Sequence, residues 1–333
     1  MPASRNASLD ALRVLSLTGI ITLHVAGGGF NDNKALAFVL DELSRFAVPA
    51  FFILSAYFWK PDELAAPVKL TLRVASRVLP AFLLWTAVFV LLKQLPHLDR
   101  AAIDYSPGGL LLLLWTGGPA FHLWFLPALV VSTAMVALAS RTLGWGWTLG
   151  LSLLLFVGGT IVGAYAKPLF GHGFPFWMDR NGLFFGPVFL TLGVLLRRHR
   201  DALATVPLWS ITAGVLAFGL LQVGEGFFLV GRYPMGHDYS LSTLGYALAV
   251  VLLFTRLDLR APFVSTLGKA TFVAYLCHPL ILNWLVMTVQ VKPSGLVIVL
   301  CLTISLAIGI AWQAARGALT ERKPVGDPIK VQR

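Results

Sequence analysis

Long apolar stretches follow one another through nearly the whole chain, and few charged residues interrupt them. Of the 333 residues, 57% are hydrophobic and only 12% are charged. A soluble domain needs about twice that charged share to cover its surface. Soluble, disordered and disulfide-rich secreted proteins are therefore excluded, and a polytopic membrane protein remains.

The apolar runs predict an all-α membrane bundle of about ten transmembrane helices, at roughly 20 residues for each span. The predicted spans are 9–29, 36–59, 77–95, 119–140, 146–166, 182–197, 206–229, 240–255, 263–286 and 295–316. The run from Leu110 to Trp115 is too short to cross a bilayer. We expect it to lie in the membrane interface or to re-enter the membrane.

The distribution of Lys and Arg predicts the orientation of the bundle. If the N-terminus is cytoplasmic, eighteen of these residues fall on the cytoplasmic side, seven fall on the other side, and Arg45 lies within a span. The positive-inside rule then places both termini in the cytoplasm. The same rule explains the net charge of +11 without a nucleic-acid partner. We expect one transmembrane domain, 1–319, and a short polar cytoplasmic tail, 320–333.

The first predicted span carries three ionisable residues on one helix face. Asp10 and Arg13 are three residues apart and can pair. Arg13 and His24 are eleven residues apart, which is three turns plus about 20°, or roughly 16 Å along the axis. Because charges inside a bilayer are costly, such residues are candidates for function. Two plainer interpretations stay open: Arg13 snorkels to the headgroups, and His24 makes a polar contact between helices.

Other predicted spans place ionisable residues at the same outer depth. These residues are Asp41, Glu42, Arg45, His122, Arg180, Glu225 and His278. Their common depth predicts a buried polar cavity in the outer half of the bundle. Ion pairing inside the bundle and an interfacial anchor at His122 are the plainer alternatives. Four further histidines fall in loops and are expected to be solvated: His97, His172, His199 and His237. His237 and its neighbour Asp238 still offer a contact to a substrate.

The cytoplasmic side carries a basic stripe of Lys69, Arg73 and Arg77, spaced four residues apart on an expected helical extension beside Arg13. A basic mouth of this kind suits a polyanion such as a nucleotide. Anionic lipid headgroups suit it as well, and for this stripe taken alone they are the favoured partner.

Several segments together resemble acyltransferase family 3, the bacterial integral-membrane enzymes that O-acylate surface carbohydrates. Arg13 and His24 match the R-x10-H signature of that family. The other matching segments are Arg45 to Tyr57, Arg73-x3-Arg77-x2-Pro80, His122 to Leu126, and Leu267-Gly268 with Tyr275 to Pro279. Each match is weak alone, but five in register are fairly specific. Ala56 departs from the usual Gly, a mild change in local packing.

The resemblance implies transfer of an acyl group from cytoplasmic acetyl-CoA to a hydroxyl of a cell-surface polysaccharide or lipid-linked glycan. It implies a multi-pass protein of the bacterial cytoplasmic membrane, with CoA, a saccharide acceptor and the lipid bilayer as partners. Some members carry an additional extracytoplasmic domain, and this chain is expected to be a stand-alone membrane module. Cys277 and Cys301 lie in apolar runs and are expected to be small buried hydrophobes, and no metal site is predicted.

With that chemistry in view, His24 is the expected general base, because imidazole is the side chain best matched to activating a hydroxyl at neutral pH. Glu225 or Asp41 would orient the imidazole, as carboxylates do in catalytic triads. Contacts to the developing oxyanion and to the acceptor are expected from Arg45, His122 and Arg180. A transient acetyl-His24 is the less favoured route.

The donor and the scaffold complete the expected assignment. The phosphates of CoA are expected to bind four cations: Arg13, Lys69, Arg73 and Arg77. Four residues of the matching motifs are expected to be structural: Asp10, Ser55, Tyr57 and His278.

A transporter or flippase of a lipid-linked glycan is the alternative, because intramembrane His, Arg and Glu also suit proton-coupled transport. Against it, the chain has no internal repeat and no matching pair of Gly/Pro-interrupted spans. A scaffold within a glycan-synthesis complex is the third hypothesis. Radiolabelled acetyl-CoA separates the first two, because an enzyme releases free CoA and labelled product and a transporter yields neither.

Overall fold

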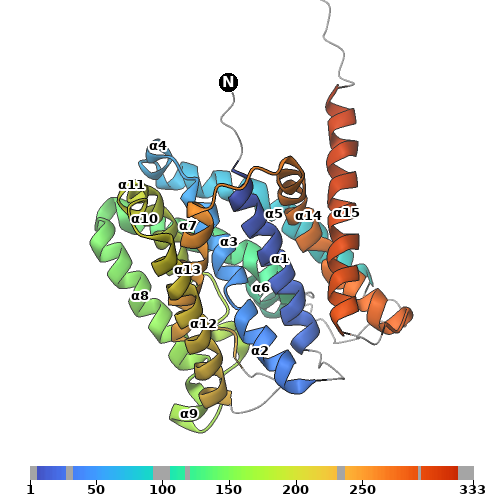
Figure 1. Ribbon diagram of the computed structural model, residues 1–333, viewed down its shortest axis with the longest axis horizontal. Coiled ribbons are helices and arrows are strands. Elements are labelled where there is room, and N and C mark those ends of the chain that lie inside the picture. Colours follow the sequence, from blue (N-terminus) through green and yellow to red (C-terminus); the bar gives the residue numbers. More distant parts are fainter. Residues whose placement is uncertain are drawn as a thin grey trace, which may run out of the picture.

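The computed structural model describes residues 6–27, 33–92, 106–116, 121–230, 237–291 and 294–321, and its regular elements are all helices (Figure 1). The longer helices are α1 (Ala7–Gly27), α2 (Lys34–Ser44), α3 (Ala47–Tyr57), α5 (Pro67–Leu92), α6 (Pro107–Thr116), α7 (Phe125–Thr142), α8 (Trp145–Val162), α10 (Gly186–Arg198), α12 (Leu208–Val230), α13 (Leu241–Arg256), α14 (Pro262–Asn283) and α15 (Ser294–Glu321). The short elements are α4 (Pro61–Leu64), η1 (Phe121–Trp124), α9 (Ala166–Phe170), η2 (Phe176–Met178), α11 (Arg200–Leu203) and η3 (Trp284–Thr288).

Within the described residues, seven helices are long and apolar enough to cross a membrane. They are α1, α5, α7 with η1, α8, α12, α14 with η3, and α15. The second, sixth and eighth predicted spans are also helical but shorter, as α2 with α3, α10 and α13. Large apolar side chains point outward, for example Trp147 at 77% exposure and Phe228 at 87%. A surface of this kind belongs in lipid, so the chain is a multi-pass membrane protein.

The second predicted span, 36–59, is two helices and not one. The helix ends at Ser44, turns through Arg45 and Phe46, and begins again at Ala47. Pro49 explains the break, because it has no N–H to donate to the carbonyl of Arg45 and is tolerated in the first turn of a new helix. The break places Arg45 at a helix junction inside the protein, where its side chain is buried.

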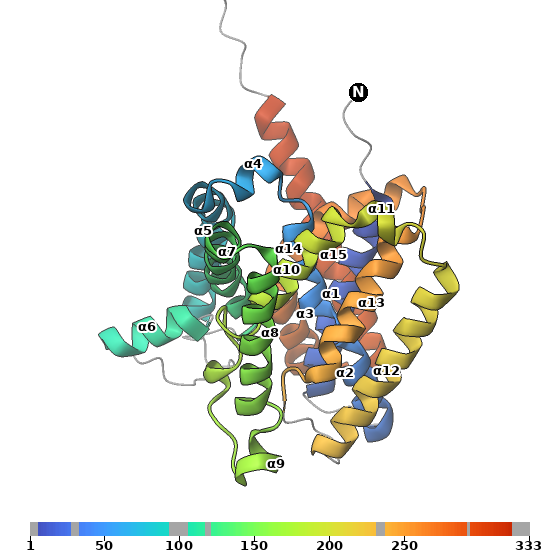
Figure 2. The ribbon, with the colours of Figure 1, turned by 90° about the vertical axis from the view of Figure 1, so that its left-hand side faces the viewer.

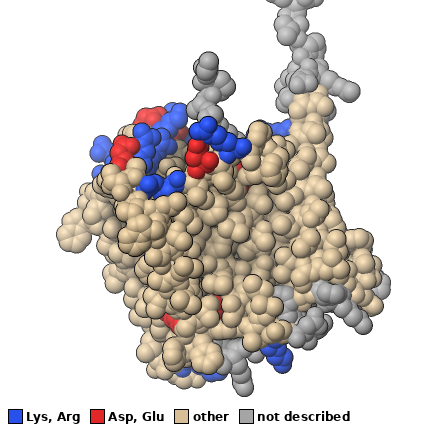
Figure 3. Space-filling view, viewed as in Figure 1, with Lys and Arg blue, Asp and Glu red and all other residues tan. Residues whose placement is uncertain are grey.

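Helix α1 lies at the centre and contacts α2, α3, α13, α14 and α15. Its first residues and the last described turn of α15 lie at the same end of the bundle (Figure 1). In the space-filling view most visible Lys and Arg gather at this end, over α4 and α11 (Figure 3). The predicted charge asymmetry is therefore present between the two ends. Helix α6, which covers the short run Leu110–Trp115, lies to the side of the bundle (Figure 2).

Small residues bring α3 and α10 together. A Cβ atom at Gly193 would lie 2.2 Å from the carbonyl oxygen of Ile53 and 3.1 Å from the Cβ atom of Ala56. The space that Gly would leave at position 56, as the resemblance leads us to expect, is thus supplied here from the facing helix. Ala56 is accommodated because residue 193 is Gly.

Candidate functional site

Helix α1 carries the first part of the candidate site. The Arg13 guanidinium donates to the Asp10 carboxylate, so the predicted pair is confirmed. Asp10 is fully buried against Gly268 of α14, where an added Cβ atom would lie 2.5 Å from the Cβ atom of Asp10. The Leu267-Gly268 motif therefore makes room for the carboxylate that holds Arg13.

A cavity of about 440 Å³ lies at the other end of the same stripe, and we call it the outer cavity after the predicted orientation. Its polar lining is His24, Asp41, Arg45, His122, Arg180, His237 and Asp238. Aromatic walls complete it, among them Trp124, Phe185, Tyr239 and Tyr275. Five residues that the sequence placed at one depth are thus brought to one cavity from α1, α2, the α2–α3 junction, η1 and the segment before α10.

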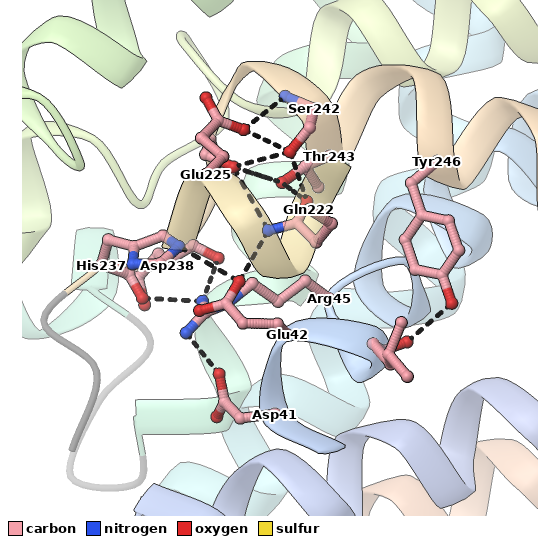
Figure 4. A network of polar contacts seen from close by, with 12 residues as sticks. Asp41, Glu42, Arg45, Gln222, Glu225, His237, Asp238, Ser242, Thr243 and Tyr246 are labelled. Atoms are coloured by element: carbon pink, nitrogen blue, oxygen red, sulfur yellow. Dashed lines mark hydrogen bonds and ion pairs between the residues drawn. The ribbon is translucent and has the colours of Figure 1, made fainter. Parts of the chain in front are cut away.

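Arg45 is the best-connected cation of this cavity (Figure 4). Its Nη2 donates to Asp41 at 2.5 Å, and its Nε lies 3.2 Å from a carboxylate oxygen of Glu42. Its Nη1 donates to the carbonyl oxygens of His237 and Asp238, both at 2.7 Å. Arg45 therefore ties the α2–α3 junction to the segment that precedes α13.

A second layer of polar contacts holds Glu42, which is fully buried. Gln222 of α12 donates to Glu42 at 2.7 Å, and Thr243 of α13 donates to Gln222 at 2.8 Å (Figure 4). Gly226 provides the space, because an added Cβ atom would lie 2.5 Å from the Glu42 carboxylate. The ion pair at the α2–α3 junction is thus fixed from two further helices.

Arg180 and Asp238, which both line the outer cavity, form a bidentate pair at 2.8 Å from Nε and 2.5 Å from Nη2. Burial alone would raise the pKa of Asp238, but the adjacent Arg180 guanidinium holds that pKa below its usual value. Burial raises the pKa of the neighbouring Asp179 to about 7, and the charge of Asp238 adds to the increase. The two carboxyl groups therefore differ: Asp238 is a carboxylate, and Asp179 holds a proton up to near neutral pH.

His237 is not solvated, contrary to the expectation from its loop position. Its side chain is 1% exposed and its Nε2 lies 3.5 Å from a carboxylate oxygen of Glu42. Burial lowers its pKa, and the charge of Arg45 lowers it further. His172 and His199 are exposed as expected, and His97 lies outside the described residues.

Three imidazoles meet beside the outer cavity. The rings of His24 and His278 stack with centroids 5.2 Å apart and planes 7° apart, and the His122 ring meets His278 edge-on at 5.3 Å. His278 was expected only as a structural motif residue, yet it lies directly against the predicted base. Among the described residues, no three His, Cys, Asp or Glu side chains are placed to hold a metal ion.

The sequence His278-Pro279 fixes the state of the His278 ring. Pro279 has no N–H, so the carbonyl oxygen of Tyr275, four residues earlier in α14, loses its usual helical donor. Nδ1 of His278 lies 2.6 Å from that oxygen. A carbonyl oxygen only accepts, so Nδ1 carries a proton, and in the neutral ring Nε2 is then the nitrogen with the lone pair.

An inner cavity of about 490 Å³ lies on the Arg13 side. Its polar lining includes Arg13, Ser55, Lys269, Thr271 and Gln313, and its walls are largely apolar. Three residues line both cavities: Ile20, Val48 and Tyr275. The two cavities therefore meet at these residues, with Arg13 on one side and His24 on the other.

The basic stripe of α5 lies apart from this inner cavity. Arg73 pairs with Glu63 of α4, while Lys69 and Arg77 are exposed, and none of the three belongs to the residues that line the cavity. Lys269 of α14 does line it, and the sequence assigned it no role. Its position one residue after Gly268 in a matching motif was the available signal.

Glu225 lies away from His24. Its carboxylate accepts from the hydroxyls of Tyr165 and Ser242 and from the backbone N–H of Ser242, and it is not among the residues that line either cavity. Of the two carboxylates expected to orient the imidazole, only Asp41 shares a cavity with it. Glu225 instead joins the ends of α12 and α13 to the segment after α8.

Two other predicted motif residues lie on α3. The Ser55 hydroxyl donates to the carbonyl oxygen of Phe51 at 2.7 Å and faces the inner cavity. The carbonyl oxygen of Tyr57 accepts from Arg197 of α10 at 3.1 Å.

The fold and the two cavities define a multi-pass membrane protein. Its interior holds polar residues in two cavities, which have three lining residues in common. A family model described as an acyltransferase domain matches residues 6–312. The chain therefore belongs to acyltransferase family 3, and the suggested resemblance is confirmed. This membership supports acyltransferase chemistry.

Two curated relatives are similar over most of this chain. An amino-acid racemase of Enterococcus faecalis is 26% identical over 84% of the chain and 41% of its own length. A serine/alanine racemase of Enterococcus gallinarum is 26% identical over 83% of the chain and 40% of its own length. The chain thus spans about two fifths of these relatives. No solved structure matches it.

Proposed function

We propose that the chain is a membrane O-acetyltransferase of the bacterial cytoplasmic membrane. It moves an acyl group from cytoplasmic acetyl-CoA to a hydroxyl of a cell-surface polysaccharide or lipid-linked glycan. The observation that carries this proposal is the meeting of two cavities at Ile20, Val48 and Tyr275, with Arg13 in the inner one and His24 in the outer one.

The inner cavity suits the donor. CoA is a polyanion with a long, largely uncharged arm, and Arg13 and Lys269 provide positive charge at the cavity that the arm would enter. The basic stripe of Lys69, Arg73 and Arg77 would attract the phosphates toward this end of the bundle. The apolar lining beyond Arg13 would then receive the arm and lead the thioester toward Tyr275.

The outer cavity suits a hydroxyl-rich acceptor. Asp41 and Asp238 offer carboxylate oxygens that accept from hydroxyls, and Arg180 offers donors. The aromatic walls offer flat apolar surfaces beside them. A saccharide presents both hydroxyls and apolar C–H faces, so this lining is complementary to it.

In the proposed step, the acceptor oxygen bonds to the thioester carbon and the C–S bond breaks. His24 takes the hydroxyl proton as general base and passes it to the CoA sulfur. Asp41 orients His24, and Arg45 and His122 stabilise the developing oxyanion. The His278 ring stacks on His24 and holds the plane of the His24 ring.

The experiment is a transfer assay with radiolabelled acetyl-CoA, purified protein and a glycan acceptor. We expect free CoA and labelled glycan from the wild type, and a loss of transfer of roughly 10²–10⁴-fold in His24→Ala. Arg13→Ala should abolish protection from heat unfolding by CoA. Full transfer by His24→Ala would show that the base is another residue, and unchanged protection would remove Arg13 from the donor site.

Transport of a small polar molecule without acyl transfer is the second candidate. The neutralised pairs Arg45–Asp41 and Arg180–Asp238 in the outer cavity favour it, because paired opposite charges also suit a zwitterion. The names of the two relatives suggest an amino acid as that molecule. Uptake of labelled serine into vesicles, without release of CoA from acetyl-CoA, would support this candidate over the first.

A further inference from the structure

Tyr275 of α14 stands between the two cavities. It lines both of them and is 6% exposed. The other two shared residues, Ile20 and Val48, have shorter side chains. Tyr275 is therefore the largest side chain that separates the donor side from the acceptor side.

The ring of Tyr275 is held at its far end, where its hydroxyl donates to the carbonyl oxygen of His122 in η1. The backbone carbonyl oxygen of Tyr275 accepts from Nδ1 of His278 in the next turn of α14. Phe125 packs against the Tyr275 ring edge-on with ring centroids 5.8 Å apart. A side chain fixed in this way forms a wall with one defined position and not a loose plug.

We propose that Tyr275 is the partition between the donor cavity and the acceptor cavity. In this role it limits the size of the acyl group that is transferred, and it keeps water of the outer cavity away from the thioester. The proposal rests on the proposed function. It assigns Tyr275 a specificity role in addition to the bond that it makes to His122. Only an acyl group small enough to pass the ring beside Ile20 and Val48 reaches His24.

Loss of the partition would permit hydrolysis in place of transfer. The oxygen of water would bond to the thioester carbon, the C–S bond would break, and a proton from water would pass to the CoA sulfur. The products are the free carboxylic acid and CoA. The reaction needs no oxidant or reductant and no further substrate, so it is measured directly as CoA release without acceptor.

The first test compares Tyr275→Ala with variants that keep the partition. Tyr275→Ala is expected to release CoA without acceptor at least tenfold faster than the wild type, and to lose its preference for acetyl over butyryl donors by roughly tenfold. Tyr275→Phe keeps the ring and should leave both ratios unchanged. Leu129→Ala enlarges only the inner cavity and Leu23→Ala only the outer one, so neither should raise hydrolysis. An unchanged ratio in Tyr275→Ala would overturn the proposal.

The second test does not depend on any enzymatic activity. In a Cys277→Ser/Cys301→Ser background, Leu23→Cys marks the outer cavity and Ser55→Cys marks the inner one. A membrane-impermeant sulfonated maleimide is applied to spheroplasts and to inside-out vesicles. We expect each cysteine to react from one side only, on opposite sides for the two positions.

Adding Tyr275→Ala should make both cysteines reactive from both sides. If that variant does not fold, Tyr275→Leu carries the same test, because its side chain is apolar but does not reach His122. Two-sided reaction in the presence of Tyr275, or one-sided reaction after its removal, would refute the partition. An acyltransferase assay that fails while the labelling behaves as expected would refute the proposed function and leave the partition in place.

Discussion

The two cavities on either side of Tyr275 use charge in opposite ways. In the outer cavity, Arg45 and Arg180 are each bound to carboxylates, so cations and anions cancel locally. In the inner cavity, Arg13 is matched by Asp10, but Lys269 is exposed and adds a further cation. The outer cavity, or outer chamber, is thus lined by neutral ion pairs that hydrogen bonds hold in place, and we call these pairs the outer frame. The inner cavity, or inner chamber, keeps a net positive charge, which we call the inner field.

This difference suits the ligands that we propose for the two chambers. A neutral, hydrogen-bonded frame positions hydroxyls by geometry and does not change when an uncharged ligand enters. A positive field attracts a polyanion at a distance and tolerates imprecise contacts. The outer frame is therefore expected to be sensitive to single substitutions, and the inner field to be distributed and robust.

The largest expected effect comes from breaking the outer frame at Arg45. Arg45→Ala leaves Asp41 and Glu42 buried without their cation, so we expect a loss of roughly 3–5 kcal/mol in the free energy of unfolding. Thermal unfolding in detergent measures it. Arg260→Ala is the matched control, because its pair with Asp258 is exposed and should contribute almost nothing. Equal unfolding temperatures for the two variants would show that the frame is not what stabilises this end.

The second effect is a pH dependence that arises at Asp179, the residue before Arg180 of the outer chamber. The folded pKa of Asp179, about 7, lies above its value in an unfolded chain. The folded state therefore binds this proton more tightly, and stability falls as the pH rises from about 4 to about 7. Asp179→Asn should remove this decrease and be more stable than the wild type at pH 8, by an amount on the order of 4 kcal/mol.

Unfolding temperatures of both proteins between pH 4 and 8 measure this effect. Asp238 should act in the opposite direction, because its pKa is lower in the folded protein than in the unfolded chain. Its contribution to stability is therefore present at neutral pH and is lost as the pH falls below the pKa of the unfolded chain. A wild-type profile that is flat between pH 4 and 7 would contradict the protonated state of Asp179.

The third effect compares two glycines, each of which makes room for a carboxylate that pairs with an arginine of one chamber. Gly226→Ala pushes on Glu42 and Gly268→Ala pushes on Asp10, so each should cost roughly 1–3 kcal/mol in unfolding free energy. Gly224→Ala and Gly295→Ala are controls with open space at the added Cβ atom. Controls as unstable as the test variants would mean that helix propensity, and not the carboxylate contacts, sets the cost.

Helix periodicity was sufficient to predict the stripe on α1. The spacing of Asp10, Arg13 and His24 places them on one face whatever surrounds the helix, and the helical ranges followed from apolar runs. Contacts between helices were not available from spacing, because they depend on how the bundle packs. Glu225 and Asp41 therefore looked equivalent as partners of His24, and only the packing separates them.

Burial of loops is the second property that the sequence did not provide. His237 lies in a polar segment and was expected to be solvated. The side chain is buried instead, and the carbonyl oxygens of His237 and Asp238 accept hydrogen bonds from the buried Arg45 guanidinium. Lys269 was missed for a related reason: a single Lys near a helix end is ordinary, and its significance depends on the cavity beside it. Local pattern predicts which residues are unusual, and packing decides which of them meet.

The smallest expected effect concerns the positive charge near the inner cavity. It decides whether Lys269 or the α5 stripe attracts the donor. Lys269 lines the inner cavity, whereas Arg77 of the α5 stripe is exposed and outside it. Lys269→Gln should raise the KM for acetyl-CoA by roughly two- to fivefold, with kcat nearly unchanged, because a partly solvated charge contributes little to binding. Arg77→Gln should change KM less, and the gap between the variants should shrink as salt screens both charges. A larger effect of Arg77→Gln at low salt would place the phosphates of the donor on the α5 stripe, as the sequence predicted, and would reduce the inner cavity to a site for the uncharged arm.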